Sequence, residues 1–167
     1  MYIGIWTVLF IIVVFDAREN RIPNKLVGLL TVVIIAHLYS FYGSVLSIPP
    51  DHLIGGLVGF SVCFALYLGG LVGAGDVKLI GSISLLIGLD DLLPYGAAVI
   101  VIGGIQSTFY LAQKLAMSQV SLGQHMRQYV THNIYGRLTK APVDAIEMRI
   151  PFAPAIVAAV ALYPIMS

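Results

Sequence analysis

The amino-acid sequence predicts an all-α, polytopic membrane protein with six transmembrane helices. Of its 167 residues, 59% are hydrophobic and only 10% are charged, and the mean hydropathy is +0.94. An average soluble domain is far less apolar than this. Because a helix needs about 20 residues to cross a bilayer, the chain has room for roughly six crossings and little else. We therefore expect a single membrane-embedded domain over residues 1–167.

Six apolar runs divide the chain, and each is expected to form one helix. They cover Met1 to Phe15, Leu26 to Tyr42, Leu53 to Leu71, Val77 to Leu89, Leu92 to Ala116 and Phe152 to Met166. Short connections join most of them. The exception is a polar loop of about 117–150, within which apolar residues at helical spacing predict an amphipathic helix on the membrane surface.

The first run is interpreted as a retained helix, because its positive charge follows the apolar core, whereas a secretory signal carries positive charge before it. The polar segment from Asp16 to Lys25 is expected to be a tight loop. Within it, Pro23 suits the first turn of the next helix, and the Asn24 side chain can satisfy free backbone groups there.

The basic residues orient the predicted bundle, because Lys and Arg accumulate in cytoplasmic loops. With six crossings, all nine Lys and Arg residues fall on one side, and the opposite loops carry Asp51, Asp90 and Asp91. We therefore expect both termini to be external and the loop of about 117–150 to be cytoplasmic. The net charge of +1 argues against nucleic acid as a partner. The apolar composition makes the lipid bilayer the expected surroundings.

The stretch from Gly73 to Lys78 places a carboxylate and an amine in a glycine turn between two apolar runs. A charged side chain within a membrane protein is costly unless it lines a cavity or has a partner, so Asp76 is a candidate functional residue. Because they lack a Cβ, Gly73 and Gly75 permit positive φ and let another backbone approach closely, as a site that grips an extended peptide beside a carboxylate would need.

A second carboxylate is expected at the same depth. Asp16 follows the first predicted helix and Asp76 precedes the fourth, so both lie at the cytoplasmic ends of their helices and can meet. Two carboxylates in one site cannot both ionise easily, so one pKa rises. The ionised group can then take a proton from water while the protonated one polarises a peptide carbonyl. This aspartic-protease chemistry needs no metal and no cofactor.

These residues carry a family resemblance. Asp16 with Arg21-Ile22-Pro23-Asn24, and Gly73-Ala74-Gly75-Asp76-Val77-Lys78, resemble the two aspartate motifs of the bacterial prepilin peptidases, the type IV and Flp-type leader peptidases of the GxGD membrane aspartyl protease family. Pro151-Phe152-Ala153-Pro154-Ala155 resembles the motif that opens their last helix. The resemblance implies Asp16 and Asp76 as the catalytic pair, with substrate binding or motif support from Gly73, Gly75, Lys78, Ile22, Pro23, Asn24, Pro151, Phe152 and Pro154.

The resemblance also implies a substrate and a location. The substrates would be prepilin or pseudopilin precursors, whose short basic leader is removed after a glycine on the cytoplasmic side of the inner membrane for pilus assembly or secretion. The pilus assembly machinery is a further expected partner. The chain begins with a membrane helix and has no cysteine pair, as in the short, peptidase-only forms, so no methyltransferase activity is expected. Ala153 stands where glycine is common in the family.

Plainer interpretations stand beside these. Asp16 alone would be a loop carboxylate paired with Arg18 or Arg21, and Asp76 alone would be a helix N-cap. Lys78 would tune the carboxylates, bind an anionic group or extend towards lipid headgroups.

Two other function classes also remain. An ion- or proton-coupled transporter uses intramembrane carboxylates, although its site tends to lie at the midplane. An intramembrane protease of the presenilin or signal-peptide-peptidase type is the other, and a structural subunit explains the motifs least.

The charge distribution makes a topological prediction. Reporters fused after Ser47 and at the C-terminus should be external, and a reporter within residues 124–140 should be cytoplasmic. Paired alkaline phosphatase and fluorescent protein fusions would measure this. A cytoplasmic C-terminus would contradict the count of six crossings.

Overall fold

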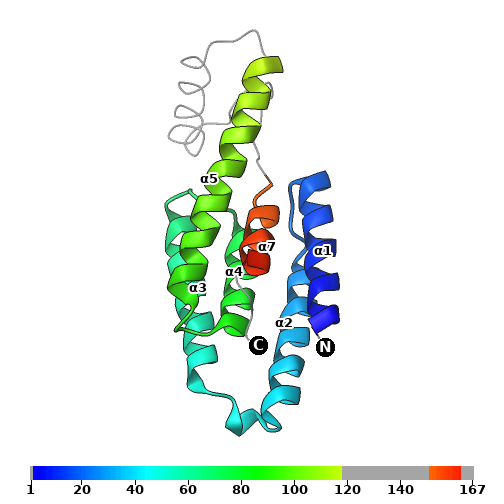
Figure 1. Ribbon diagram of the computed structural model, residues 1–167, viewed down its shortest axis with the longest axis vertical. Helices are drawn as coiled ribbons and strands as arrows, with labels where there is room; N and C mark the ends of the chain where they lie inside the picture. Colours follow the sequence, from blue (N-terminus) through cyan, green and yellow to red (C-terminus); the bar gives the residue numbers. More distant parts are fainter. Residues whose placement is uncertain (1, 118–150, 163–167) are drawn as a thin grey trace. The chain divides into compact units, whose positions relative to one another are not determined.

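The computed structural model describes residues 2–117 and 151–162, and all regular structure in these ranges is helical. The elements are α1 (Tyr2–Glu19), α2 (Asn24–Tyr42), a short 3-10 helix η1 (Val45–Ser47), α3 (Pro50–Leu68), α4 (Ala74–Ile87), α5 (Leu92–Met117) and α7 (Ala153–Leu162) (Figure 1). The all-α class is therefore confirmed. The amphipathic helix expected within residues 117–150 lies outside the described residues.

Three described helices are long and apolar enough to cross a membrane: α2 over Asn24–Tyr42, α3 over Pro50–Leu68, and α5 over Leu92–Gln113. This indicates a membrane protein. α4 has only 14 residues, and α1 carries three charged side chains in its last turn, Asp16, Arg18 and Glu19. Six crossings therefore remain a prediction, of which three are supported by length and composition.

The chain divides into two compact units. The first contains residues 1–103 and 151–167, and the second contains residues 104–150. Within the described part of the chain, the second unit consists of the C-terminal half of α5. Every residue discussed below as part of a site belongs to the first unit.

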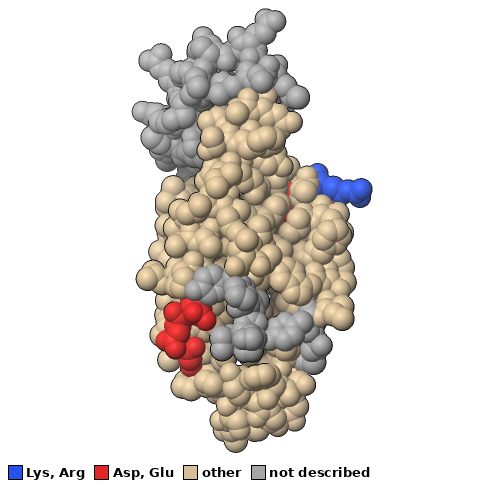
Figure 2. All heavy atoms as spheres, viewed as in Figure 1, with Lys and Arg blue, Asp and Glu red and all other residues tan. Residues whose placement is uncertain are grey.

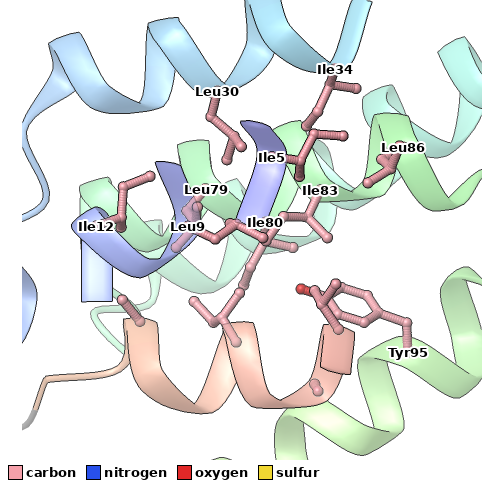
Figure 3. Packing of buried hydrophobic residues seen from close by; sticks show 14 of the residues in the cluster. Ile5, Leu9, Ile12, Leu30, Ile34, Leu79, Ile80, Ile83, Leu86 and Tyr95 are labelled. Carbon is pink, nitrogen blue, oxygen red and sulfur yellow. The ribbon is translucent and has the colours of Figure 1, made fainter. Parts of the chain in front are cut away.

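α4 is the central helix of the first unit, because it packs against α2, α3 and α7, while α1 packs against α2 and α7. Figure 3 shows α4 residues Leu79, Ile80, Ile83 and Leu86 meeting side chains from α1, α2 and α5. Most of α4 is buried, including Ser82 and Ser84. A helix covered on several sides in this way is fixed by its neighbours, so the residues at its start have defined positions.

Glycines on α3 allow it to lie close to α4. A Cβ atom at Gly55 would lie 2.5 Å from the carbonyl carbon of Gly88, and one at Gly59 would overlap the side chain of Ser84. Small residues permit such close helix contact, which is a main source of association between helices in membranes.

The end of α4 opposite Asp76 is tied to both neighbouring helices. Asp51 Oδ1 accepts a hydrogen bond from the Leu89 backbone N–H at 3.0 Å. His52 Nδ1 lies 3.1 Å from the Leu85 carbonyl oxygen, and its Nε2 lies 3.1 Å from the Tyr42 hydroxyl. Since a carbonyl only accepts, Nδ1 carries the proton in this arrangement. These contacts hold the adjoining ends of α2, α3 and α4 together.

Two helix boundaries differ from the prediction. α1 continues to Glu19, so Asp16 lies in its last turn and not in a loop; Asn20 ends the helix with a left-handed φ of 50°. α4 begins at Ala74 and not at Val77. The Asp76 carboxylate accepts a hydrogen bond from the Gly73 N–H at 3.3 Å, and this satisfies a free donor that permits the earlier start.

The contact between α3 and α4 predicts the effect of one added methyl group. Gly55→Ala should lower the stability of the folded protein by about 1–3 kcal/mol, because the new Cβ meets backbone atoms that cannot rotate away. Thermal unfolding of purified protein in detergent would measure this. Gly96→Ala on α5, where a Cβ meets no atom within 4 Å, is the matched control and should change stability by at most about 1 kcal/mol, in the stabilising direction. Equal melting temperatures for the two variants would contradict the packing argument.

Candidate active site

Asp16 is a buried carboxylate in the last turn of α1, with 5% of its surface exposed. Its Oδ2 atom accepts a hydrogen bond from the Ala153 backbone N–H at 2.9 Å. Burial raises the pKa of Asp16, while hydrogen bonds from the backbone of Ala153 and Phe152 lower it. Within the described ranges it makes no ion pair with Arg18 or Arg21, so the plainer interpretation of Asp16 as a paired loop carboxylate is wrong.

The donors to Asp16 are the free backbone groups at the start of α7. The Phe152 carbonyl accepts from Ala155 and Ile156 at 3.1 and 3.2 Å, so the helix begins just after Phe152. Pro154 lacks an N–H and has a φ that suits the first turn. The remaining N–H groups need an acceptor, and the positive end of a helix favours an anion. The expectation that this motif opens the last helix is confirmed, but the sequence analysis missed its N–H groups as the partner of Asp16.

Asp76 is the third residue of α4 and is partly buried. Its carboxylate accepts a hydrogen bond from the N–H of Gly73, the N-cap residue. The interpretation of Asp76 as an N-cap is therefore partly right, although Asp76 acts from the third position of the helix. Its pKa is raised to about 6, first by burial and then by the negative charge of Asp16, against the lowering effect of the Gly73 N–H. Both aspartates lie outside the three helices that are long enough to cross a membrane.

Asp16 and Asp76 interact electrostatically, since the charge of Asp16 contributes to the raised pKa of Asp76. They lie at the end of the unit that also carries Arg18, Arg21, Lys25 and Lys78, where α1 meets α2 and α3 meets α4. The described acidic residues of the opposite end are Asp51, Asp90 and Asp91. Figure 2 shows this separation on one face, with blue side chains level with the end of α1 and a red group towards the other end.

The two glycines of the turn make room for neighbouring side chains. Gly73 has a φ of −77° and is the N-cap of α4, and Gly75 lies within the helix; the described residues with positive φ include neither. Neither glycine therefore uses the positive φ that it permits. What both positions need is space for side chains: a Cβ at Gly73 would lie 3.0 Å from Asp76 Oδ2, and one at Gly75 would lie 3.0 Å from the Cβ of Ile22. The close approach of an extended peptide stays a prediction.

The other residues of the first two motifs also meet. Ile22 packs on Gly75, as above, and Lys78 Nζ donates a hydrogen bond to Asn24 Oδ1 at 2.9 Å. Pro23, with a φ of −65°, is the N-cap of α2 and lies just before its first turn. Asn24 was expected to cap this helix, but its side chain makes no capping bond and binds Lys78 instead.

The residues of the third motif surround the start of α7. Pro151 is buried and Phe152 is partly exposed. A Cβ at Gly103 would lie 2.5 Å from Phe152 Cε2, so the absence of a side chain at Gly103 makes room for this ring. The predicted site residues thus lie at four places: the end of α1, the start of α2, the start of α4 and the start of α7. Among the described residues, no group of three or more His, Cys, Asp or Glu side chains could hold a metal ion.

The hydrogen bond from Ala153 to Asp16 makes a prediction that does not depend on activity. Ala153→Pro removes the donor at a position where proline fits the start of a helix, and it puts a ring carbon in place of the proton. Because the donor favours the ionised form, its loss should raise the pKa of Asp16. Difference infrared spectra across a pH series would follow the protonated carboxyl, which Asp16→Asn would identify. Ala153→Gly keeps the N–H and should titrate like the wild type; identical titration of the proline variant would refute the contact.

Comparison with known proteins places the chain in a family. A model of the type IV leader peptidase family matches residues 3–108, which include Asp16, the segment Ile22–Asn24 and the segment Gly73–Lys78. No curated protein and no solved structure matched the chain. The match covers more than half of the sequence and includes the first two motifs. The chain belongs to the type IV leader peptidase family and is a protease of the prepilin-peptidase type.

Proposed function

We propose that this protein is an aspartic endopeptidase that cleaves the leader peptide from prepilin-like precursors, with Asp16 and Asp76 as its catalytic pair. The observation that carries the proposal is the interaction between these carboxylates, which are far apart in the sequence but close enough for the charge of Asp16 to raise the pKa of Asp76. Family membership supports the reaction class, and the residues at the site supply the chemistry.

The surroundings of the two carboxylates favour different protonation states. Asp16 accepts hydrogen bonds from the start of α7, which stabilise its anion. Asp76 has one weaker donor, Gly73, and the repulsion from Asp16, so it takes up a proton first. We assign Asp16 as the base and Asp76 as the acid, while the pair titrates as one unit.

The proposed reaction follows from this assignment. Asp16 removes a proton from a water molecule, and the oxygen of that water attacks the carbonyl carbon of the scissile peptide bond. Protonated Asp76 donates a hydrogen bond to the carbonyl oxygen and stabilises the developing negative charge. The tetrahedral intermediate collapses when the leaving nitrogen receives a proton, and the C–N bond breaks. No covalent intermediate forms, and the carboxylates end with one proton between them, as they began.

The location of the site fits a precursor with a basic leader. The aspartates lie at the end of the unit that carries the described Lys and Arg side chains, and this end is the cytoplasmic one by the charge rule. A precursor whose apolar helix lies in the bilayer would present its leader junction at this level. We propose cleavage on the cytoplasmic side of the inner membrane, after a glycine, for pilus assembly or secretion, without methylation of the new N-terminus.

The two-carboxylate mechanism predicts the effect of single amide substitutions. Asp16→Asn and Asp76→Asn should each lower the rate of precursor cleavage by at least about 10²-fold, since each removes one partner of the acid–base pair. The double variant should be hardly slower, because residues that act as a unit are not additive. Processing of a candidate prepilin in membranes with matched amounts of each variant would measure this.

The matched control is Asp90→Asn, at the opposite end of the unit, which should cleave at nearly the wild-type rate. The mass of the mature N-terminus in the same samples would reveal any methyl transfer. Robust processing by either single variant at the site would refute the mechanism and favour a transporter or a structural subunit.

The raised pKa of Asp76 predicts the pH dependence. Activity needs this group protonated, so kcat/KM should fall as pH rises through about 6, and by roughly tenfold between pH 7 and pH 8. It should fall again at low pH as Asp16 becomes protonated, which gives a bell-shaped profile. Initial rates with a quenched peptide substrate would provide the profile, and return to pH 6 would exclude inactivation. Activity that increases steadily from pH 6 to pH 8 would contradict this assignment of the acid.

A further inference from the structure

A groove lies between α2 and α3, with α4 as its floor. α2 and α3 each pack against α4, and Figure 1 shows them on either side of it, joined at one end through η1. The groove has a volume of about 570 Å³, which is in the range of sites that hold small molecules. Neither Asp16 nor Asp76 lines it, although Asn24 and Lys78 of the first two motifs do.

One end of the groove is positively charged. Lys78 and Asn24 line it there, joined by the hydrogen bond from Nζ to Oδ1 of 2.9 Å, and both side chains are exposed. An ammonium group has three donors, of which this bond uses one. No carboxylate forms an ion pair with Lys78 in the part of the chain that the structure describes. The groove therefore offers a positive charge with free hydrogen-bonding capacity at its mouth.

The hydroxyl groups deeper in the groove are already satisfied. Thr31 Oγ1 and Ser82 Oγ lie 2.8 Å apart. Each also lies 2.9 Å from a carbonyl oxygen of its own helix, Thr31 from that of Val27 and Ser82 from that of Lys78. Since each hydroxyl has one proton, two of these three contacts are hydrogen bonds at any one time. Beyond Lys78 and Asn24, the groove therefore presents mainly apolar surface.

The remaining length of the groove is apolar and open. Leu53 and Leu57 on α3 are exposed by 64% and 67%, and Phe60 by 41%. These three residues belong to α3, and the residues across the groove belong to α2. Both helices are long and apolar enough to cross a membrane. Exposed apolar surface on such helices faces hydrocarbon chains. Along α4, the distance from Lys78 to Leu85 corresponds to roughly 10 Å of helix.

A glycine on the wall of the groove leaves room for an occupant. A Cβ added at Gly28 would meet no atom within 4 Å, whereas one at Gly56 or Gly81, which also line the groove, would touch Leu85 or Phe60. Gly56 and Gly81 therefore allow helices to pack. Gly28 contacts nothing in the protein, so a side chain at this position would extend into the open space.

We propose that this groove binds one anionic phospholipid, with its phosphate on Lys78 and an acyl chain between α2 and α3. The charge and shape of the groove match such a molecule from end to end: a cation at the polar end and continuous apolar surface beyond it. A precursor helix is the alternative occupant of the apolar part, and the test below distinguishes the two. Since Lys78 and Asp76 lie in the first two turns of the same helix, the lipid would border the candidate active site.

Lipid binding to the full chain, purified in neutral detergent, tests this proposal. Native mass spectrometry would compare dioleoyl phosphatidylglycerol, dioleoyl phosphatidylcholine and inorganic phosphate. We expect one bound phosphatidylglycerol, and phosphatidylcholine bound about tenfold more weakly, because both lipids present the same phosphate to Lys78 but the choline group adds a positive charge beside it. Inorganic phosphate should neither bind detectably nor compete, because it has no acyl chain.

Two variants separate the two ends of the groove. Lys78→Gln should weaken phosphatidylglycerol binding about tenfold. It should change phosphatidylcholine binding much less, because the lost contact with the phosphate is offset by the lost repulsion of the choline cation. Gly28→Leu should weaken both lipids, because the new side chain occupies the position of the acyl chain. Gly96→Leu makes the same substitution at an α5 glycine with open space outside the groove, and it should bind like the wild type. If Gly28→Leu does not fold by circular dichroism and gel filtration, the Lys78→Gln result alone decides.

Three outcomes would overturn the proposal. The first is equal affinity of the wild type for the two phospholipids. The second is a preference for phosphatidylglycerol that is unchanged in Lys78→Gln. The third is normal lipid binding by folded Gly28→Leu together with loss of binding to a candidate prepilin. The last outcome would assign the groove to the precursor. Because lipid binding is measured without cleavage, an active Asp16→Asn enzyme would refute the proposed mechanism and leave this proposal untouched.

Discussion

The hydrogen bond between the Asp16 carboxylate and the Ala153 N–H is the contact on which the arrangement of this site depends. A buried carboxylate is costly unless donors replace its water, and the first N–H groups of a buried helix are costly unless they find an acceptor. The hydrogen bond from the Ala153 N–H to Asp16 Oδ2, at 2.9 Å, meets both requirements, because it joins the end of α1 to the start of α7. This bond ties the first helix to the last described one, and it holds one carboxylate of the pair where α4 presents the other.

α4 is the second requirement, because its start must be rigid to hold Asp76. Its surroundings explain why so short a helix is well fixed. Glycines at positions 55 and 59 bring α3 into close contact along its length, and the bonds of Asp51 and His52 hold its far end. Gly75 lets Ile22 approach at the near end. The position of Asp76 thus depends on close helix packing as much as on the hydrogen bond from Gly73.

The first unit has two ends with different properties. The end with the aspartates carries the described basic side chains and the exposed mouth of the groove, where Asn24 and Lys78 meet. The other end carries acidic side chains and is closed by the contact between Tyr42 and His52. This asymmetry places the two aspartates at the basic end of the unit, beside the mouth of the groove.

The sequence by itself determined the helical class, the order of the apolar segments and the pair of aspartates. These follow from local signals: hydropathy over about 20 residues, charge beside apolar runs, and short motifs. It left open whether Gly73 and Gly75 serve a positive φ or close packing, because a glycine in a sequence does not reveal whether φ or space is the constraint.

Only the tertiary structure decided which atoms surround each carboxylate. The partner of Asp16 is a backbone N–H, which every residue except proline has, so no side chain in the sequence marks Ala153 as the donor. Asn24 was expected to serve its own helix, yet it binds Lys78 from α4. The groove, too, arises only because α2 and α3 pack on α4 from either side. Such features depend on contacts between segments far apart in the chain, and neither hydropathy nor motif spacing carries information about them.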